Sequence, residues 1–149
     1  MSVEYKYFRV AQQIANDFDA AVLDEISESH CFEMGKSWQA VHFALTGSRE
    51  ETDELLSKAI FGDELVLVSG VTFALVNRVV AKEVFDALSN LDMVMARNRL
   101  EQDHSDNLYS FDYDNLDDAI EETLSQIELF TSFYKDADKH GEIVLVKSV

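Results

Sequence analysis

The sequence contains no proline, one cysteine and five glycines in 149 residues. These scarcities exclude collagen-like chains and proline-rich linkers, since both depend on those residues. The single cysteine, Cys31, excludes a disulfide within the chain and favours a reducing compartment. No apolar run is long enough to cross a bilayer as a helix, because the longest, residues 65–76, is interrupted by Ser69, Gly70 and Thr72.

Basic residues are also scarce, with 12 Lys and Arg against 29 Asp and Glu and a formal net charge of −17. So acidic a surface repels nucleic acid and anionic membranes, and we expect neither as a partner. Apolar residues still make up 47% of the chain, which is enough to bury a single core and argues against whole-chain disorder. The first residues lack the basic and apolar regions of a secretory signal. We therefore expect one cytoplasmic domain over residues 1–149.

Hydrophobic periodicity predicts an α+β fold. Apolar residues recur at helical spacing in several segments, and residues 93–101 either continue the fourth helix or form their own. The predicted helices span residues 11–28, 36–46, 77–91 and 114–140, and a short third helix follows the Ser48 cap and ends at Gly62. Aromatic and β-branched segments predict strands at residues 3–10, 65–68, 71–75 and 143–146. We expect a single domain in which a long C-terminal helix and other helices pack with a small sheet of N-terminal, central and C-terminal strands.

Local signals indicate where some of these elements begin and end. Ser48 and Glu51 form the Ser-x-x-Glu pattern of a capping box, which predicts the start of the third helix. Acidic residues in the first turns and Gly141 after the last turn mark the bounds of the longest helix. Residues 31–32 and the polar stretch 102–113 are expected to be loops. Whether the two central strands pair as a hairpin stays open.

Three groups of residues, spread over most of the chain, match motifs of a known family. The first fits the pattern K-x-W-x-x-x-H-[FY]-x-L-T-G, the second A-I-x-G and the third F-Y-x-x-A-x-x-x-G. The matching residues are Lys36-Ser37-Trp38, His42-Phe43 and Leu45-Thr46-Gly47, then Ala59-Ile60-Phe61-Gly62, then Phe133-Tyr134 with Ala137 and Gly141. In these motifs the sequence resembles the YfbM-like family of uncharacterised bacterial proteins, a domain of unknown function.

The resemblance implies an α+β fold and a cytoplasmic bacterial protein. It supplies no established activity, so no catalytic residue is carried over from it. The sequence departs from the family at Gly35, where the family usually has an Asp before the Lys of the first motif. The N-cap that such an Asp would provide to the following helix is therefore missing.

Two side chains of the first motif, Trp38 and His42, lie one helical turn apart on the same helix face. One interpretation is a small-molecule pocket formed by Trp38, His42, Thr46 and Gly47, with an aromatic wall and a titratable imidazole. The other is a core histidine that stacks on Trp38 and bonds to a backbone carbonyl. The apolar neighbours on this face favour the core histidine.

No motif in the chain predicts a metal, a cofactor or a nucleophile. His30, Cys31 and His42 lack the paired spacing of a structural zinc site. A calcium loop beginning at Asp103 would need glycine at its sixth position, where the chain has Leu108. Phosphate-binding loops and nucleophile elbows are absent as well. We expect no cofactor, no metal and no catalytic residue.

The acidic side chains gather in one tract near the start of the longest helix. They are Asp103, Asp106, Asp112, Asp114, Asp117, Asp118, Glu121 and Glu122. We interpret them as an interaction surface, although a merely solvated face is the simpler alternative. The first functional hypothesis is a non-catalytic binding protein, immunity- or antitoxin-like, that meets a basic protein partner. The alternative is a small-molecule-binding protein or enzyme with a pocket near Trp38 and His42. Mutual repulsion within the tract predicts raised carboxylate pKa values, and the oligomeric state does not follow from the sequence.

Overall fold

A five-stranded antiparallel sheet organises the computed structural model, which describes residues 3–11, 30–68, 71–103 and 107–149. The strand order within these residues is β2-β1-β5-β4-β3. The strands are β1 (Tyr5–Ala11), β2 (Cys31–Gly35), β3 (Glu64–Val68), β4 (Val71–Val76) and β5 (Glu142–Ser148). The central strand β5 pairs with β1 along its whole length, and its middle residues 144–146 pair with the C-terminal half of β4. N-terminal, central and C-terminal segments thus share one sheet, as expected.

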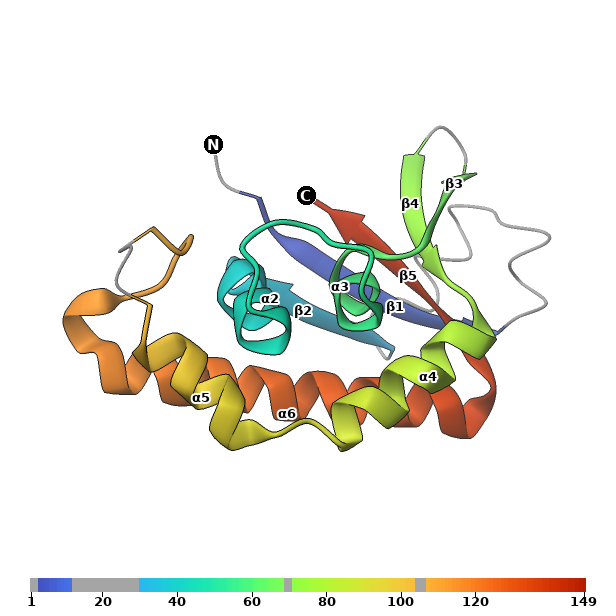
Figure 1. Ribbon diagram of the computed structural model, residues 1–149. Helices are drawn as coiled ribbons and strands as arrows, with labels where there is room; N and C mark the ends of the chain where they lie inside the picture. Colours follow the sequence, from blue (N-terminus) through green and yellow to red (C-terminus); the bar gives the residue numbers. More distant parts are fainter. Residues whose placement is uncertain (1–2, 12–29, 69–70, 104–106) are drawn as a thin grey trace.

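Helices supply the second layer of the α+β fold. They are α2 (Trp38–Thr46), α3 (Leu55–Phe61), α4 (Arg78–Ser89), α5 (Met93–Glu101), the 3₁₀ turn η2 (Tyr113–Asn115) and α6 (Leu116–His140). Figure 1 shows α6 running the length of the molecule, with α4 and α5 beside it. Residues 93–101 form a helix of their own, because Asp92 caps α5 by accepting bonds from the backbone N–H groups of Val94 and Met95.

The long helix α6 confirms the prediction made from its periodicity. Its apolar stripe, which includes Phe130 and Tyr134, is buried, while Glu121, Glu122 and Glu128 face solvent. Gly141 ends the helix in the left-handed conformation, with a φ of 63°. Glycine adopts this conformation without steric strain, whereas a residue with a Cβ is strained in it.

The two faces of the sheet bury different residues, as the alternation of a strand requires. On the helix side, Tyr7 and Val144 join the main core. On the opposite side, Phe8 and Leu145 belong to a second apolar cluster. The Tyr7 hydroxyl donates a hydrogen bond of 2.9 Å to the carbonyl of Ile60, so the start of the sheet is tied to α3.

The structure corrects two local expectations and settles one open question. Residues 31–32 are not a loop: they begin the edge strand β2, which pairs with β1 through Phe8↔Cys31 and Tyr7↔Phe32. The capping box at Ser48 is wrong as well, because α3 begins at Leu55 and the Ser48 hydroxyl bonds to the backbone of Glu50 instead. The central strands β3 and β4 pair as an antiparallel hairpin.

The helix expected over residues 11–28 lies almost entirely outside the described residues. The other predicted helices and strands are confirmed, and apart from the start of the third helix their ends are shifted by a few residues at most.

Candidate functional site

Trp38, at the start of α2, lies half-buried in an aromatic cluster. Its ring centroid lies 5.3 Å from that of Tyr5, 5.8 Å from that of Phe61 and 5.9 Å from that of Tyr109. Its indole N–H donates a 3.0 Å hydrogen bond to the carbonyl of Val3. Trp38 therefore fills the space between the first strand, α3 and the loop before α6.

His42, one turn later on α2, is fully buried, and both ring nitrogens have partners. Nδ1 lies 2.8 Å from the carbonyl oxygen of Ser48, and Nε2 lies 2.9 Å from the hydroxyl of Ser57. The carbonyl can only accept, so Nδ1 carries the proton and Nε2 accepts from Ser57. The Ser57 oxygen in turn accepts from the backbone N–H of Thr52. Burial is the main cause that lowers the pKa of His42, which favours this neutral tautomer.

The remaining residues of the expected pocket have structural contacts. The Thr46 hydroxyl donates to the carbonyl of His42, and Gly47 ends α2 in the left-handed conformation. The His42 ring packs on Phe61, at a centroid distance of 5.0 Å, rather than on Trp38. This geometry favours the core-histidine interpretation, because the imidazole is closed off from solvent.

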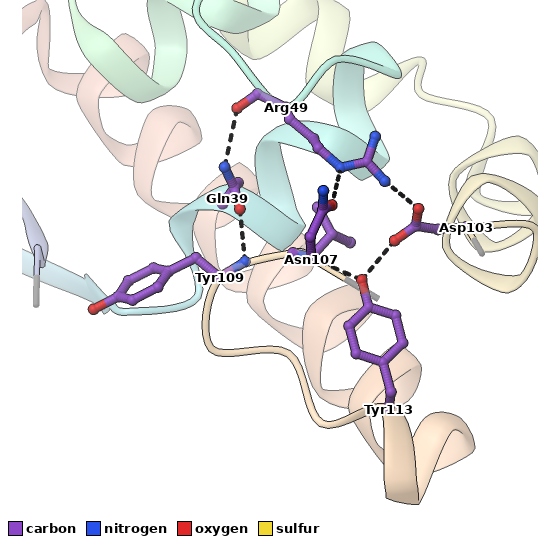
Figure 2. Close-up of polar contacts among 7 residues, drawn as sticks. Gln39, Arg49, Asp103, Asn107, Tyr109 and Tyr113 are labelled. Atoms are coloured by element: carbon purple, nitrogen blue, oxygen red, sulfur yellow. Dashed lines mark hydrogen bonds and ion pairs between the residues drawn. The ribbon is translucent and has the colours of Figure 1, made fainter. Parts of the chain in front are cut away.

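Asp103 is set apart from the rest of the acidic tract by the partly buried polar cluster to which it belongs (Figure 2). Its side chain is 3% exposed, forms an ion pair with Arg49 and accepts a 2.6 Å hydrogen bond from the Tyr113 hydroxyl. Arg49 also donates to the side chain of Asn107 and lies over the ring of Phe43, 4.8 Å from its centroid. Asp103 therefore holds the fold together and adds no exposed charge to the surface.

The same cluster holds the loop before α6 against α2. Gln39 donates to the carbonyl of Arg49 and accepts a 2.6 Å hydrogen bond from the backbone N–H of Tyr109 (Figure 2). The backbone N–H of Leu108 donates to the Tyr113 hydroxyl. The stretch that the sequence predicts as a loop is thus irregular in backbone but held by specific bonds.

Six carboxylates of the tract remain on the surface around the first half of α6, and we call them the acidic face. They are Asp112, Asp114, Asp117, Asp118, Glu121 and Glu122, all exposed. The remaining member of the predicted set, Asp106, lies outside the described residues. Hydrogen bonds, first from the Asn115 side chain and then from backbone N–H groups, lower the pKa of Asp112, contrary to the rise expected from repulsion. Local capping outweighs repulsion at this carboxylate.

A cleft of about 470 Å³ borders the acidic face on the side of α2, and we call it the α2–α6 cleft. Its lining consists of Glu4, Lys36, Ser37, Ala40, Ser110, Phe111, Asp112, Ala119, Glu122 and Thr123. Three carboxylates therefore surround one cation, and Lys36 forms no ion pair with any residue that the structure describes. None of the four expected pocket residues lines this cleft. The cleft suits a positively charged group better than an anion.

A shallower groove of about 260 Å³ lies on the other side of the acidic face, between α5 and α6. We call it the α5–α6 groove; its lining is Met93, Val94, Arg97, Glu121, Leu124, Ser125 and Glu128. Arg97 pairs with both Glu101 and Glu121, so the guanidinium is already shared by two carboxylates. The groove combines an apolar floor with a negative rim.

Comparison with known proteins finds a family and a solved structure that match almost the whole chain. The model of a family described as a domain of unknown function, DUF1877, matches residues 4–147. The chain belongs to this family. Among solved structures, the DUF1877 chain is similar to the crystal structure of YfbM, a protein of unknown function from Escherichia coli, with a TM-score of 0.74 and 18% sequence identity. The match covers 98% of this chain and 99% of that one.

The family match confirms the resemblance found in the motifs, and the YfbM match confirms the α+β fold. At this level of identity the likeness shows the fold alone. No curated protein gives a significant match to the DUF1877 chain. Among its described residues, no helix is both long and apolar enough to cross a membrane, and no three His, Cys, Asp or Glu side chains gather as metal ligands would.

Sequence reasoning missed most of the apolar and uncharged lining of the two hollows. Lys36 and Ser37 belong to the first family motif, whose spacing does not indicate that they line a cleft. Val94 carried a signal that could have been used: it is apolar, yet it does not share the helix face of the buried Ala96 and Leu100. An apolar residue outside the buried stripe is a direct indication of exposed hydrophobic surface.

Proposed function

We propose that this chain is a non-catalytic cytoplasmic binding protein whose acidic face meets a basic protein partner, in the manner of an immunity protein or an antitoxin. One observation carries the proposal. Of the six carboxylates of the acidic face, Glu121 alone forms an ion pair with a residue that the structure describes. The other five present their negative charge to solvent and have no ion-pair partner among the described residues.

Such a surface favours association with a cationic one for two reasons. Unpaired carboxylates on neighbouring turns repel one another, and a partner's Lys and Arg side chains relieve that repulsion. The potential of a chain with a net charge of −17 also extends beyond contact distance and steers a basic partner towards it. The α2–α6 cleft, with Glu4, Asp112 and Glu122 in its wall, offers a place for a single cationic side chain.

The small-molecule alternative is less well supported. It depends on His42, which is fully buried and bonded at both ring nitrogens. A ligand would have to displace the Ser48 or Ser57 contact to reach the imidazole, and His42 lines neither the α2–α6 cleft nor the α5–α6 groove.

A matched pair of variants tests the proposal. The first carries Asp117→Asn, Asp118→Asn, Glu121→Gln and Glu122→Gln. The control carries the same change of charge at exposed acids elsewhere, Glu50→Gln, Glu64→Gln, Glu83→Gln and Asp86→Asn. Each immobilised protein captures partners from a lysate of its source organism at low and at high salt, and the eluates are compared by mass spectrometry.

We expect wild type and control to retain the same salt-sensitive basic protein, and the acidic-face variant to lose it. Equal capture by the two variants would mean that overall charge, and not the acidic face, governs retention. Absence of any salt-sensitive protein from the wild-type eluate would contradict the proposal itself.

A further inference from the structure

Exposed apolar side chains lie in and next to the α5–α6 groove: Val94 lines it, while Met95 and Leu129 neighbour lining residues on their helices. Val94 is 67% exposed in the groove wall. Leu129 is 56% exposed and follows Ser125, another lining residue, by one turn of α6. Met95 is 42% exposed beside Val94. Exposed apolar side chains that gather around one hollow mark an interaction surface more often than scattered ones do.

The start of α5 explains why these side chains turn outward. The Asp92 carboxylate caps the helix through the N–H groups of Val94 and Met95. With the helix phase set there, Ala96 and Leu100 face the core. The core of this helix is complete without Val94, so a polar residue at that position would cost the fold little.

The charge around the groove determines the charge of a partner that can bind there. Arg97 is the single cation among the described residues that line the groove, and Glu101, Glu121 and Glu128 surround it. Asp117 lies one turn before Glu121 on α6. Glu128 forms no ion pair with a residue that the structure describes. The groove therefore repels an acidic occupant, including a second copy of this chain with its own net charge of −17.

We propose that the α5–α6 groove docks a basic amphipathic helix of a partner protein. The apolar side of that helix lies on Val94, Leu124 and Leu129, and its Lys or Arg side chains reach Glu121 and Glu128. A helix is the fitting shape, because its ridges pack into the groove between two neighbouring helices. This inference rests on the proposed function and adds the form of the basic segment and the place where it binds.

The test uses a defined probe in place of the unidentified partner. A fluorescent peptide that repeats the heptad Leu-Lys-Lys-Leu-Leu-Lys-Leu is titrated with the full chain, and binding is followed by anisotropy. A peptide of the same composition, reordered so that no helix face is apolar, reports charge attraction alone. The groove variant is Val94→Ser with Leu129→Ser, and the control is Leu65→Ser with Val79→Ser, at positions 79% and 68% exposed outside the groove. Circular dichroism verifies that both variants are folded.

We expect the heptad peptide to bind wild type and control alike, and the groove variant on the order of tenfold more weakly. The reordered peptide should bind all three with the same low affinity. Equal binding of the heptad peptide to groove variant and control would overturn the inference, as would no preference for it over the reordered peptide. If wild type sediments as a dimer and the groove variant sediments as a monomer, the groove binds a second copy of the chain instead.

Failure of the inference and failure of the proposed function give different results. If only the groove is wrong, peptide binding still falls in the variant Asp117→Asn, Asp118→Asn, Glu121→Gln, Glu122→Gln relative to its charge-matched control. If the proposed function is wrong, that variant and its control bind the peptide equally at every salt concentration.

Discussion

His42 allows a test of whether its imidazole is closed off from solvent in the core or open to it. We consider His42→Gln, because glutamine keeps one donor and one acceptor but does not titrate. The amide cannot reach Ser48 and Ser57 with the same geometry, so one of the two hydrogen bonds weakens. A buried group left without its partner costs about 1–3 kcal/mol, and we expect a loss of that size at neutral pH.

The pH dependence provides the sharper signature. Burial lowers the pKa of His42, and the Ser48 hydrogen bond and the charges of Glu51 and Glu54 oppose that shift without reversing it. Below an ordinary histidine pKa of about 6.5 the unfolded chain therefore binds a proton that the native chain does not. Wild-type stability then decreases as pH falls from that value towards the lowered pKa, by at most about 1.4 kcal/mol per pH unit.

Urea denaturation of wild type and His42→Gln over a pH series measures this directly. Groups that titrate in both proteins cancel in the difference between the two free energies of unfolding. We expect the advantage of wild type to shrink as the solution becomes more acidic. A difference that stays constant with pH would show that His42 has the same proton affinity in the folded and unfolded chain, and the assignment of a closed, neutral imidazole would be wrong.

Three further predictions concern packing and charge. Trp38→Ala should lower the free energy of unfolding by about 2–4 kcal/mol, less than for a fully enclosed tryptophan, and a chemical denaturation midpoint equal to that of wild type would refute its role in the aromatic cluster. Gly62→Ala should destabilise by about 2 kcal/mol or more, since φ is 82° and an added Cβ would lie 2.3 Å from that of Ala74; thermal melts check this, with Gly35→Ala as a positive-φ control in open space. The melting temperature of wild type should rise with sodium chloride at neutral pH, because salt screens repulsion within the acidic face, and a salt-independent value would contradict unpaired charge there.

The success of the sequence in predicting α6 has a local cause. Its apolar positions keep helical phase from Leu116 to Ala137, and the signals at both ends act within a few residues. The failure at β2 is equally physical. The five residues Cys31–Gly35 form a strand, with an irregular register, because β1 lies alongside them. Their own sequence has no alternation of apolar and polar residues that would predict this pairing.

The candidate site was predictable only where charge alone decides. Acids at the start of a helix stay exposed unless a partner buries them, so all six carboxylates of the acidic face could be named in advance. Asp103 could not be separated from it, because its partner Arg49 lies 54 residues away in the sequence. The apolar part of the α5–α6 groove depends on the rotation of α5 against α6, which tertiary packing sets.

The position of β5 in the sheet bears on how the chain reaches its native state. This strand comes after all the other described strands in the sequence, yet it is the one that joins β1 to β4. Before residues 142–148 join the sheet, it consists of two separate ladders, one formed by β1 and β2 and the other by β3 and β4, with no strand pairing between them. Contacts that join sequence-distant strands form slowly, because a long loop must close first. Docking of β5 is therefore the step that we expect to limit the rate of sheet assembly during folding.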